Sequence, residues 1–261
     1  MGKAILYDAT LCIGCKACEQ ACSEQNHLPY NETIAAEEAT SEHKFTSVLT
    51  RGENYLRRMC MHCEDPTCAS VCPVGALRKT ELGPVTYEES RCIGCRYCMV
   101  ACPFSAPKYE WGKVLPGVRK CTMCAQRVAA GQATACAEAC PTGATKFGDR
   151  DELIAEARQR LAQNPTQYVN HIFGLSEVGG TSVLMISGVP FERFGMRSNY
   201  VQEPLPLLTY RVLSRIPDLV TLGSVLLGGV WWITHRRAEV AAAEGNATKP
   251  GEKEPETEKN P

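Results

Sequence analysis

The chain has 261 residues and a formal net charge of −1, with 28 Lys and Arg against 29 Asp and Glu. A balance this close to neutral gives no electrostatic reason to bind nucleic acid. Sixteen cysteines and only 7% aromatic residues predict a domain held together by bound metal more than by a large apolar core.

Short strands are predicted on either side of the cysteine-rich loops. Residues 3–8 and 84–88 are strand-like runs that each precede a group of cysteines, and residues 76–77 and 144–145 begin return strands after Cys-Pro-x-Gly turns. We therefore expect small antiparallel hairpins, with short helices after the fourth cysteine of a group. The fold class predicted by this pattern is α+β and ferredoxin-like.

The sixteen cysteines form four groups that vary one ligand spacing. The first and third groups read C-x2-C-x2-C-x3-C, the second widens the middle gap to four residues and the fourth widens it to eleven. The groups are Cys12, Cys15, Cys18 and Cys22; Cys60, Cys63, Cys68 and Cys72; Cys92, Cys95, Cys98 and Cys102; Cys121, Cys124, Cys136 and Cys140. In this bacterial ferredoxin pattern the fourth cysteine binds the other cluster of a two-cluster unit. At four thiolates per cluster, the sequence predicts four [4Fe-4S] clusters.

Residues between the ligands are expected to tune the clusters. Gly14 and Gly94 have no Cβ, so the backbone N–H groups can approach the sulfur atoms and stabilise the reduced cluster. His62 is expected to fill its loop and hydrogen-bond within it, with tuning of the nearest cluster as the alternative. Five basic residues beside ligands either offset cluster charge or are solvated: Lys16, Arg91, Arg96, Arg119 and Lys120.

Two other uses of the cysteines fit the pattern less well. Disulfide frameworks belong mostly to short secreted domains, which this chain is not. The fourth group alone would pass for a zinc knuckle, but the first and third groups would not. A zinc-stapled interaction module is kept as an alternative, and it predicts a colourless protein. No Ser-His-Asp set, phosphate loop or carboxylate pair accompanies the cysteines, so we expect no substrate chemistry on this chain.

Residues 1–164 hold every cysteine and are expected to form two nested two-cluster modules. The segments are residues 1–25 with 112–150 as one module, 60–111 as the other, and 26–59 as a polar insertion on the surface.

The chain beyond the cysteines is expected to begin with a helix over 149–164, where Asp149 and Glu152 form a capping-box pattern. Residues 165–210 are interpreted as an extended docking segment for a partner. Within it, residues 182–187 resemble a buried strand.

Residues 211–237 are predicted to be a transmembrane anchor. Leu219–Thr234 carries no charge and is slightly shorter than the roughly 20 residues that span a bilayer. Trp231 and Trp232 suit a membrane interface, and flanking arginines extend the usable length: Arg211, Arg215, Arg236 and Arg237. A buried core helix is the alternative. His235 is expected to be interfacial, with an approach to a partner's haem or quinone as the alternative, and residues 238–261 are expected to be a disordered tail.

The ligand loops Cys12–Cys18, Cys60–Pro66 and Cys140–Ala144 resemble those of a known family. It comprises the four-cluster iron–sulfur (beta) subunits of membrane-bound bacterial oxidoreductases, of the formate dehydrogenase and respiratory hydrogenase types. Val178–Thr181 and the late single helix extend the resemblance to about residue 237. Cys95 stands where nitrate-reductase-type relatives carry Trp, which implies four cubane clusters.

The resemblance implies which cysteines share a cluster. The implied sets are Cys12, Cys15, Cys18 and Cys140; Cys22, Cys121, Cys124 and Cys136; Cys60, Cys63, Cys68 and Cys102; Cys72, Cys92, Cys95 and Cys98.

It also implies the partners and the location. Electrons would pass between a catalytic subunit of formate dehydrogenase type and a multi-span, quinone-reactive membrane subunit. The chain would cross the bacterial cytoplasmic membrane once, with its ferredoxin region in the periplasm and its tail in the cytoplasm. Residues 1–10 show no apolar leader, so export together with a signal-bearing partner is expected. The alternatives are the equivalent subunit of a respiratory [NiFe] hydrogenase and an anchored ferredoxin-like carrier without a fixed partner.

Overall fold

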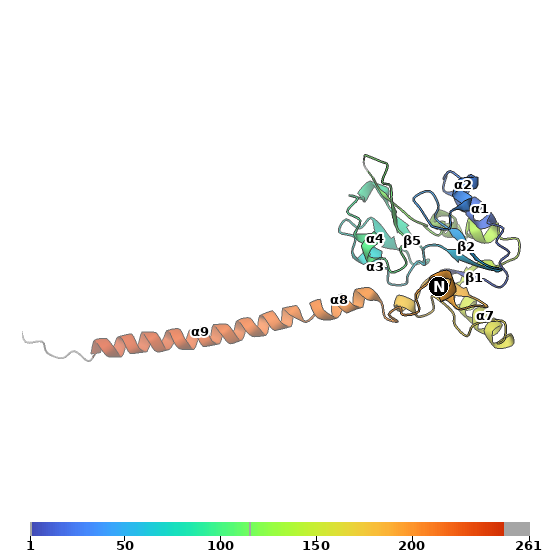
Figure 1. Ribbon diagram of the computed structural model, residues 1–261. Helices are drawn as coiled ribbons and strands as arrows, with labels where there is room; N and C mark the ends of the chain where they lie inside the picture. The colour runs from blue at the N-terminus through green and yellow to red at the C-terminus, as the bar shows by residue number, and fades with distance from the viewer. Residues whose placement is uncertain (1, 115, 248–261) are drawn as a thin grey trace, which may run out of the picture. The chain divides into compact units, whose positions relative to one another are not determined.

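The computed structural model describes residues 2–114 and 116–247, which divide into two units at Leu208 (Figure 1). A three-stranded sheet forms the centre of the first unit. Strand β1 (Lys3–Asp8) pairs antiparallel with β8 (Thr145–Asp149) and parallel with β9 (Val183–Ile186). Ile5 and Tyr7 face one apolar cluster, whereas Ala4 and Leu6 face another. Both faces of the strand are therefore covered, which explains its continuous apolar run.

Helix α7 (Arg150–Gln163) covers one face of this sheet through Leu153, Ile154 and Ala157. The predicted helix over 149–164 is thereby confirmed. The predicted capping box is wrong, because Asp149 makes no side-chain cap. Its carboxylate instead accepts a hydrogen bond from Lys3 Nζ at 2.9 Å, which joins two neighbouring strands.

The ligand loops connect short helices and two-stranded hairpins. The helices are α1 (Ala17–Gln25), α3 (Thr67–Ser70), α4 (Tyr97–Ala101), α5 (Ala125–Ala129) and α6 (Ala135–Glu138). The hairpins are β4 (Leu77–Lys79) with β5 (Val85–Tyr87) and β6 (Lys108–Tyr109) with β7 (Val118–Arg119), and a 3-10 turn, η1, spans Glu89–Arg91. The predicted strands are confirmed. The helices, however, mostly contain the third cysteine of a group, whereas we expected them to follow the fourth. The helix begins in the part of the loop that lies after the second cysteine.

Figure 1 shows α3, α4 and β5 gathered in one half of the first unit and α1, α2 and β2 in the other. Helix α1 packs against α6, and α3 packs against α4. The half with α1 and α6 thus brings together helices that carry cysteines of the first and fourth groups, and the half with α3 and α4 brings together those of the second and third.

Residues 26–59 are less superficial than expected. They form helix α2 (Glu32–Ala36) and the hairpin of β2 (Ser47–Arg51) and β3 (Asn54–Arg58), in which Val48, Leu49 and Leu56 are buried. Lys44 Nζ lies 2.9 Å from Glu19 Oε2 on α1, and both side chains are buried. A polar residue of this segment therefore anchors it to α1, which carries cysteine ligands. The sequence of the segment has no clear periodicity, so this attachment was not predicted.

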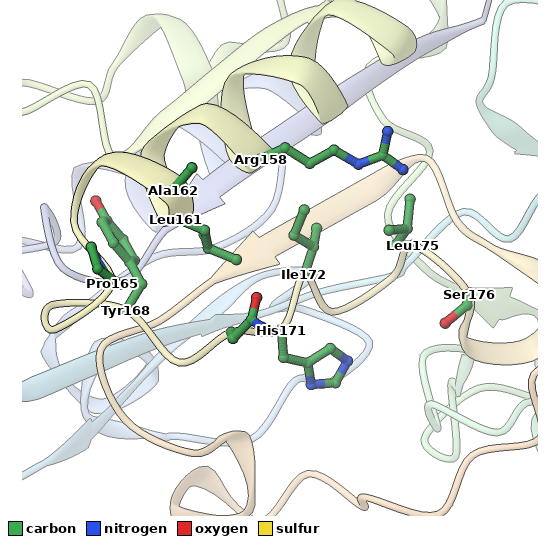
Figure 2. A pocket seen from close by; sticks show the side chains of 10 residues that line it. Arg158, Leu161, Ala162, Pro165, Tyr168, His171, Ile172, Leu175 and Ser176 are labelled. Atoms are coloured by element: carbon green, nitrogen blue, oxygen red, sulfur yellow. The ribbon is translucent and has the colours of Figure 1, made fainter.

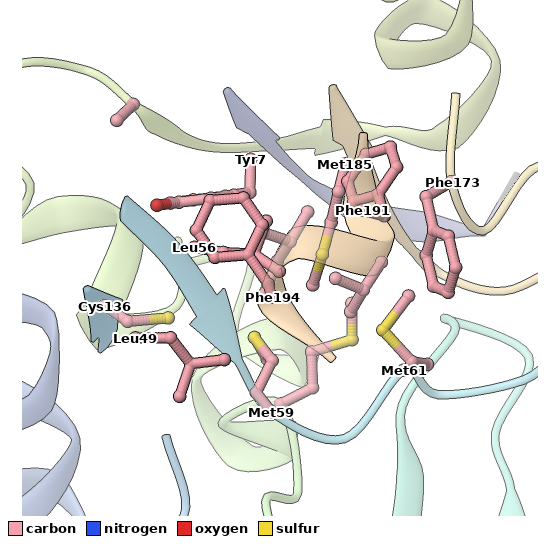
Figure 3. Packing of buried hydrophobic residues seen from close by; sticks show 14 residues of the cluster. Tyr7, Leu49, Leu56, Met59, Met61, Cys136, Phe173, Met185, Phe191 and Phe194 are labelled. Carbon is pink, nitrogen blue, oxygen red and sulfur yellow. The ribbon is translucent and has the colours of Figure 1, made fainter. Parts of the chain in front are cut away.

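The segment 165–210 packs on the chain's own core. Strand β9 is fully buried, as the pattern over 182–187 predicted. The 3-10 turns η2 (Glu177–Gly179) and η3 (Phe191–Phe194) flank it, and Phe173, Phe191 and Phe194 pack together with Tyr7 and Met185 (Figure 3). The interpretation as a docking segment is corrected to this extent, because its apolar residues complete an internal core.

The second unit is helical. Helix α8 (Leu205–Leu213) begins in the first unit and is followed by α9 (Ile216–Ala247), with the break just before Pro217. The stretch Leu205–Gly245 is long and apolar enough to cross a membrane, and none of its most apolar window is buried. The described residues therefore favour the anchor over the core-helix alternative. Residues 238–247, expected to be disordered, continue α9, whereas the rest of the predicted tail lies outside the described residues.

Candidate metal centres

All sixteen cysteines are free of disulfide bonds. They also do not form compact single-ion sites: within residues 2–114 and 116–247, no three Cys, His, Asp or Glu side chains converge on a position for one metal ion. Structural zinc would need four ligands, with Zn–S distances of about 2.3 Å around one ion. A cubane instead places each thiolate on a different iron. Among the described residues the cysteines therefore do not match four single-ion zinc sites.

One apolar cavity is lined by cysteines of two groups. Cys72 of the second group faces Cys92, Cys95 and Cys98 of the third, together with apolar side chains that include Val118. Burial, followed by the neighbouring Cys92, Cys95 and Cys72, raises the pKa of Cys98 to about 11. Four soft donors around an apolar hollow form the environment that an iron–sulfur cluster requires.

Next to this cavity, the fourth cysteine of the third group likewise lies near cysteines of the second group. Burial raises the pKa of Cys63, and its neighbours Cys60, Cys102 and Cys68 add to the rise. Cys102 is therefore close to three cysteines of the second group. Its Sγ accepts a hydrogen bond from the backbone N–H of Ala106 at 3.4 Å.

In the other half, Cys22 on α1 lies among cysteines of the fourth group. Burial raises the pKa of its thiol, followed by Cys121, Cys136 and Cys124. The packing of α1 against α6 brings these residues together.

The remaining cysteines are the least enclosed set. Cys12, Cys18 and Cys140 pack against the same apolar core, and the pairing of Tyr7 with Thr145 aligns the strands that precede and follow them. Cys15 is exposed on its loop.

The backbone of the ligand loops is bent to present N–H groups to sulfur. Gly14 and Gly94 have φ values of 70° and 68°, and a Cβ on Gly14 would lie 2.4 Å from the Tyr55 ring. The N–H groups of Gly94 and Met123 donate to Cys92 Sγ at 3.4 Å and to Cys121 Sγ at 3.3 Å. Successive N–H groups in such turns form concave anion sites. The role predicted for the two glycines fits this geometry.

The basic residues flagged from the sequence differ in their surroundings. Lys120 is buried and donates to the backbone oxygens of Val85 and Cys121. Arg91 and Arg119 form ion pairs with Glu88 and Glu110. The remaining two are directed elsewhere: Arg96 lies over the rings of Tyr109 and Trp111, and Lys16 Nζ donates to the Ala35 carbonyl.

Two histidines were also singled out. His62 Nδ1 accepts the backbone N–H of Val85 at 2.8 Å, and burial followed by Lys120 and Lys79 lowers its pKa well below the usual value. His62 is thus a buried, hydrogen-bonded residue that fills its loop. His235 stacks on Trp231 and is exposed on α9.

Arg57 is a residue that the sequence analysis missed. It is fully buried on β3, three positions before Cys60, and its charge interacts with cysteines of two other groups. Its role could not be predicted from its position in the sequence, because Arg57 on β3 interacts with residues on β8 and α6, which are distant in the chain.

A hollow of about 580 Å³ lies away from the cysteines. It is bordered by Arg158 and Leu161 on α7 and by Tyr168, His171 and Ile172 on the segment that follows (Figure 2). Its lining includes no cysteine, so it is no part of the candidate metal centres.

The fold and the thiol arrangement define an iron–sulfur protein of the ferredoxin type. Two matches to the 4Fe-4S dicluster domain cover residues 11–76 and 50–150. A protein of Nitratidesulfovibrio vulgaris is 39% identical over 254 residues, covering 92% of this chain and 69% of that protein. The hydrogenase-2 operon protein HybA of Escherichia coli O157:H7 is 37% identical, over 83% of each chain.

The iron–sulfur subunit of nitrate-inducible formate dehydrogenase from Escherichia coli K12 is also 37% identical, over 70% of this chain and 67% of that subunit. The chain therefore belongs to the family of formate dehydrogenase and hydrogenase-type iron–sulfur subunits, as its ligand loops predicted.

Proposed function

We propose that this chain is a non-catalytic electron-transfer subunit with four [4Fe-4S] clusters. It would relay electrons between a catalytic subunit of formate dehydrogenase type and a quinone-reactive membrane subunit. The observation that carries this proposal is the apolar cavity in which Cys72 joins Cys92, Cys95 and Cys98. In two-cluster ferredoxins the fourth cysteine of each group binds the cluster of the other group. Two clusters paired in this way are suited to passing electrons between them.

The proposed ligand sets are those that the resemblance implied, arranged as two nested modules. The neighbours of Cys63 and Cys22 support two further sets. In the remaining set, Cys12, Cys18 and Cys140 pack against one apolar core, and Cys12 interacts with Cys18. When bound, the clusters supply one-electron chemistry; the protein supplies thiolates, backbone donors and exclusion of water.

Contacts between the sets favour a linear order. Cys18 of the first set interacts with Cys136 of the second. Cys121 of the second set interacts with Cys60 of the third. Cys68 of the third set interacts with Cys98 of the fourth. The sets with Cys15 and Cys95 therefore form the two ends.

Both ends reach the surface. Cys15 and Cys95 are exposed, and the apolar side chains of Ile13 and Ile93 are 60% and 66% exposed on the same loops. Exposed apolar residues around a redox centre are suited to contact with an electron-transfer partner. We assign one end to the catalytic subunit and the other to the membrane subunit.

The helix over Leu205–Gly245 is proposed to anchor the chain in the bacterial cytoplasmic membrane, with the cluster region in the periplasm. Trp231, Trp232 and the arginines Arg236 and Arg237 follow its apolar stretch and suit a membrane interface.

The equivalent role in a respiratory hydrogenase is the second candidate. The match to HybA spans 83% of this chain, whereas the match to the formate dehydrogenase subunit spans 70%. An anchored carrier without a fixed partner is the third, and purification from native membranes separates it from the others. Co-elution with a large catalytic chain supports a fixed subunit; a lone brown protein supports the carrier.

Iron and acid-labile sulfide assays on anaerobically purified protein test the proposal. We expect about sixteen of each per chain, from four cubanes, and electron paramagnetic resonance (EPR) signals on reduction. Bound zinc without labile sulfide would refute the proposed function.

A further inference from the structure

Arg57 is a buried cation without an acidic partner. The residue is 0% exposed, and its Nη1 donates to Thr145 Oγ1 at 3.0 Å. Among the described residues no Asp or Glu forms an ion pair with it, and its Nε has no hydrogen-bond partner. Arginine stays protonated in proteins. A buried, unpaired guanidinium is strongly destabilising, so this site requires an anion.

The titratable groups whose charge acts on Arg57 include three cysteine thiols and the Tyr7 hydroxyl. Burial lowers the pKa of Arg57, but Cys136, Cys18, Tyr7 and Cys121 raise it by more. Cys18 belongs to one proposed ligand set, and Cys136 and Cys121 belong to another.

Contacts in the core fix the guanidinium at this position. Its carbon lies 5.7 Å from the centre of the Tyr7 ring, and Tyr7 belongs to the apolar core that includes Cys136 and that Cys12, Cys18, Cys121 and Cys140 pack against. Thr145 accepts from Arg57 through its hydroxyl, and it pairs with Tyr7 across strands β8 and β1. Arg57 is therefore held between two groups of thiolates by rigid strands.

We propose that Arg57 is the shared counter-cation of the two clusters bound by Cys12, Cys15, Cys18 and Cys140 and by Cys22, Cys121, Cys124 and Cys136. The inference rests on the proposed function, because it requires those clusters. A cluster gains negative charge on reduction, and a fixed positive charge in a poorly solvated site stabilises that form strongly. Arg57 thus raises the reduction potentials of these two clusters and leaves the other two largely unaffected.

The test compares Arg57→Gln with Arg57→Lys in the full-length protein, purified anaerobically with its partners. Glutamine keeps a hydrogen-bond donor and removes the charge, whereas lysine keeps the charge. Potentials are measured by EPR-monitored redox titration. In Arg57→Gln we expect two clusters to show at least a tenfold lower ratio of reduced to oxidised form at fixed potential, which is about 59 mV per tenfold. Arg57→Lys retains most of the wild-type potentials.

Arg160→Gln is the matched control, since Arg160 Nη1 pairs with Asp8 Oδ2 at 2.6 Å and the charges acting on it are carboxylates. It should shift no cluster potential. Unchanged potentials in Arg57→Gln, or equal shifts in the glutamine and lysine variants, overturn the inference. If Arg57→Gln assembles only two clusters while Arg57→Lys assembles four, the result supports a requirement for positive charge at position 57. Loss of the same clusters in both variants overturns the inference. A wild-type protein without iron refutes the proposed function instead.

Discussion

The buried ion pair between Glu19 and Lys44 gives the sharpest stability prediction. Lys44→Met leaves the Glu19 carboxylate buried, where it still accepts from Val48 N at 2.6 Å and from the Tyr30 hydroxyl at 3.0 Å but has lost its cation. Removing one partner of a buried pair costs about 3–5 kcal/mol. The lost partner connects residues 26–59 to α1, so we expect that segment to open locally roughly a hundred- to several-thousand-fold more often.

Hydrogen exchange of the backbone amides of Val48 and Leu49 measures this opening. Arg51→Met is the matched control, because Arg51 pairs with Glu38 at 2.7 Å in a largely exposed ion pair, and its loss should cost less than about 1 kcal/mol. The double variant Glu19→Gln with Lys44→Met should recover much of the protection. If Lys44→Met accelerates exchange no more than Arg51→Met does, the buried pair is not what holds the segment.

Three further predictions concern the clusters and the anchor. Cys72→Ser should impair the cluster of the third cysteine group, while Cys68→Ser should impair that of the second. EPR spectra of the reduced variants distinguish the two clusters. The same spectral loss in both variants would contradict the assignment of Cys72 to the cluster of the third group. Gly14→Ala should cost about 1–2 kcal/mol from its positive φ, with a further cost from displacing Tyr55, measured as faster loss of cluster absorbance on heating. Deleting residues 205–261 should move the protein from the membrane fraction to the soluble fraction, and retention in washed membranes would argue against the anchor.

Local patterns predicted the local structure well. The run at residues 3–8 is β1, the residues after Asp149 form α7, and residues 183–186 form a buried strand. The two strands are continuous apolar runs and α7 has apolar residues at helical spacing, so neighbouring residues alone determine each element. The cysteine spacing likewise determined the family, because a ligand loop is a local structure.

Interactions between distant residues were not predictable in this way. Arg57 meets Thr145 across 88 positions, and Glu19 meets Val48 across 29. A buried polar residue has the same sequence signature as an exposed one, and only its partners show why it is inside. For the same reason the segment 165–210 was interpreted as a docking segment, although its apolar residues complete the chain's own core.

The position of β1 between β8 and β9 has a consequence for biosynthesis. Strand β1 leaves the ribosome before both of its neighbours and meets them only after residues 145–149 and 183–186 have been made. Residues 60–111, by contrast, contain their own hairpin and can acquire structure while translation continues. Iron insertion would then proceed from the middle of the polypeptide outward, and a stalled nascent chain would carry its amino-terminal thiols unprotected.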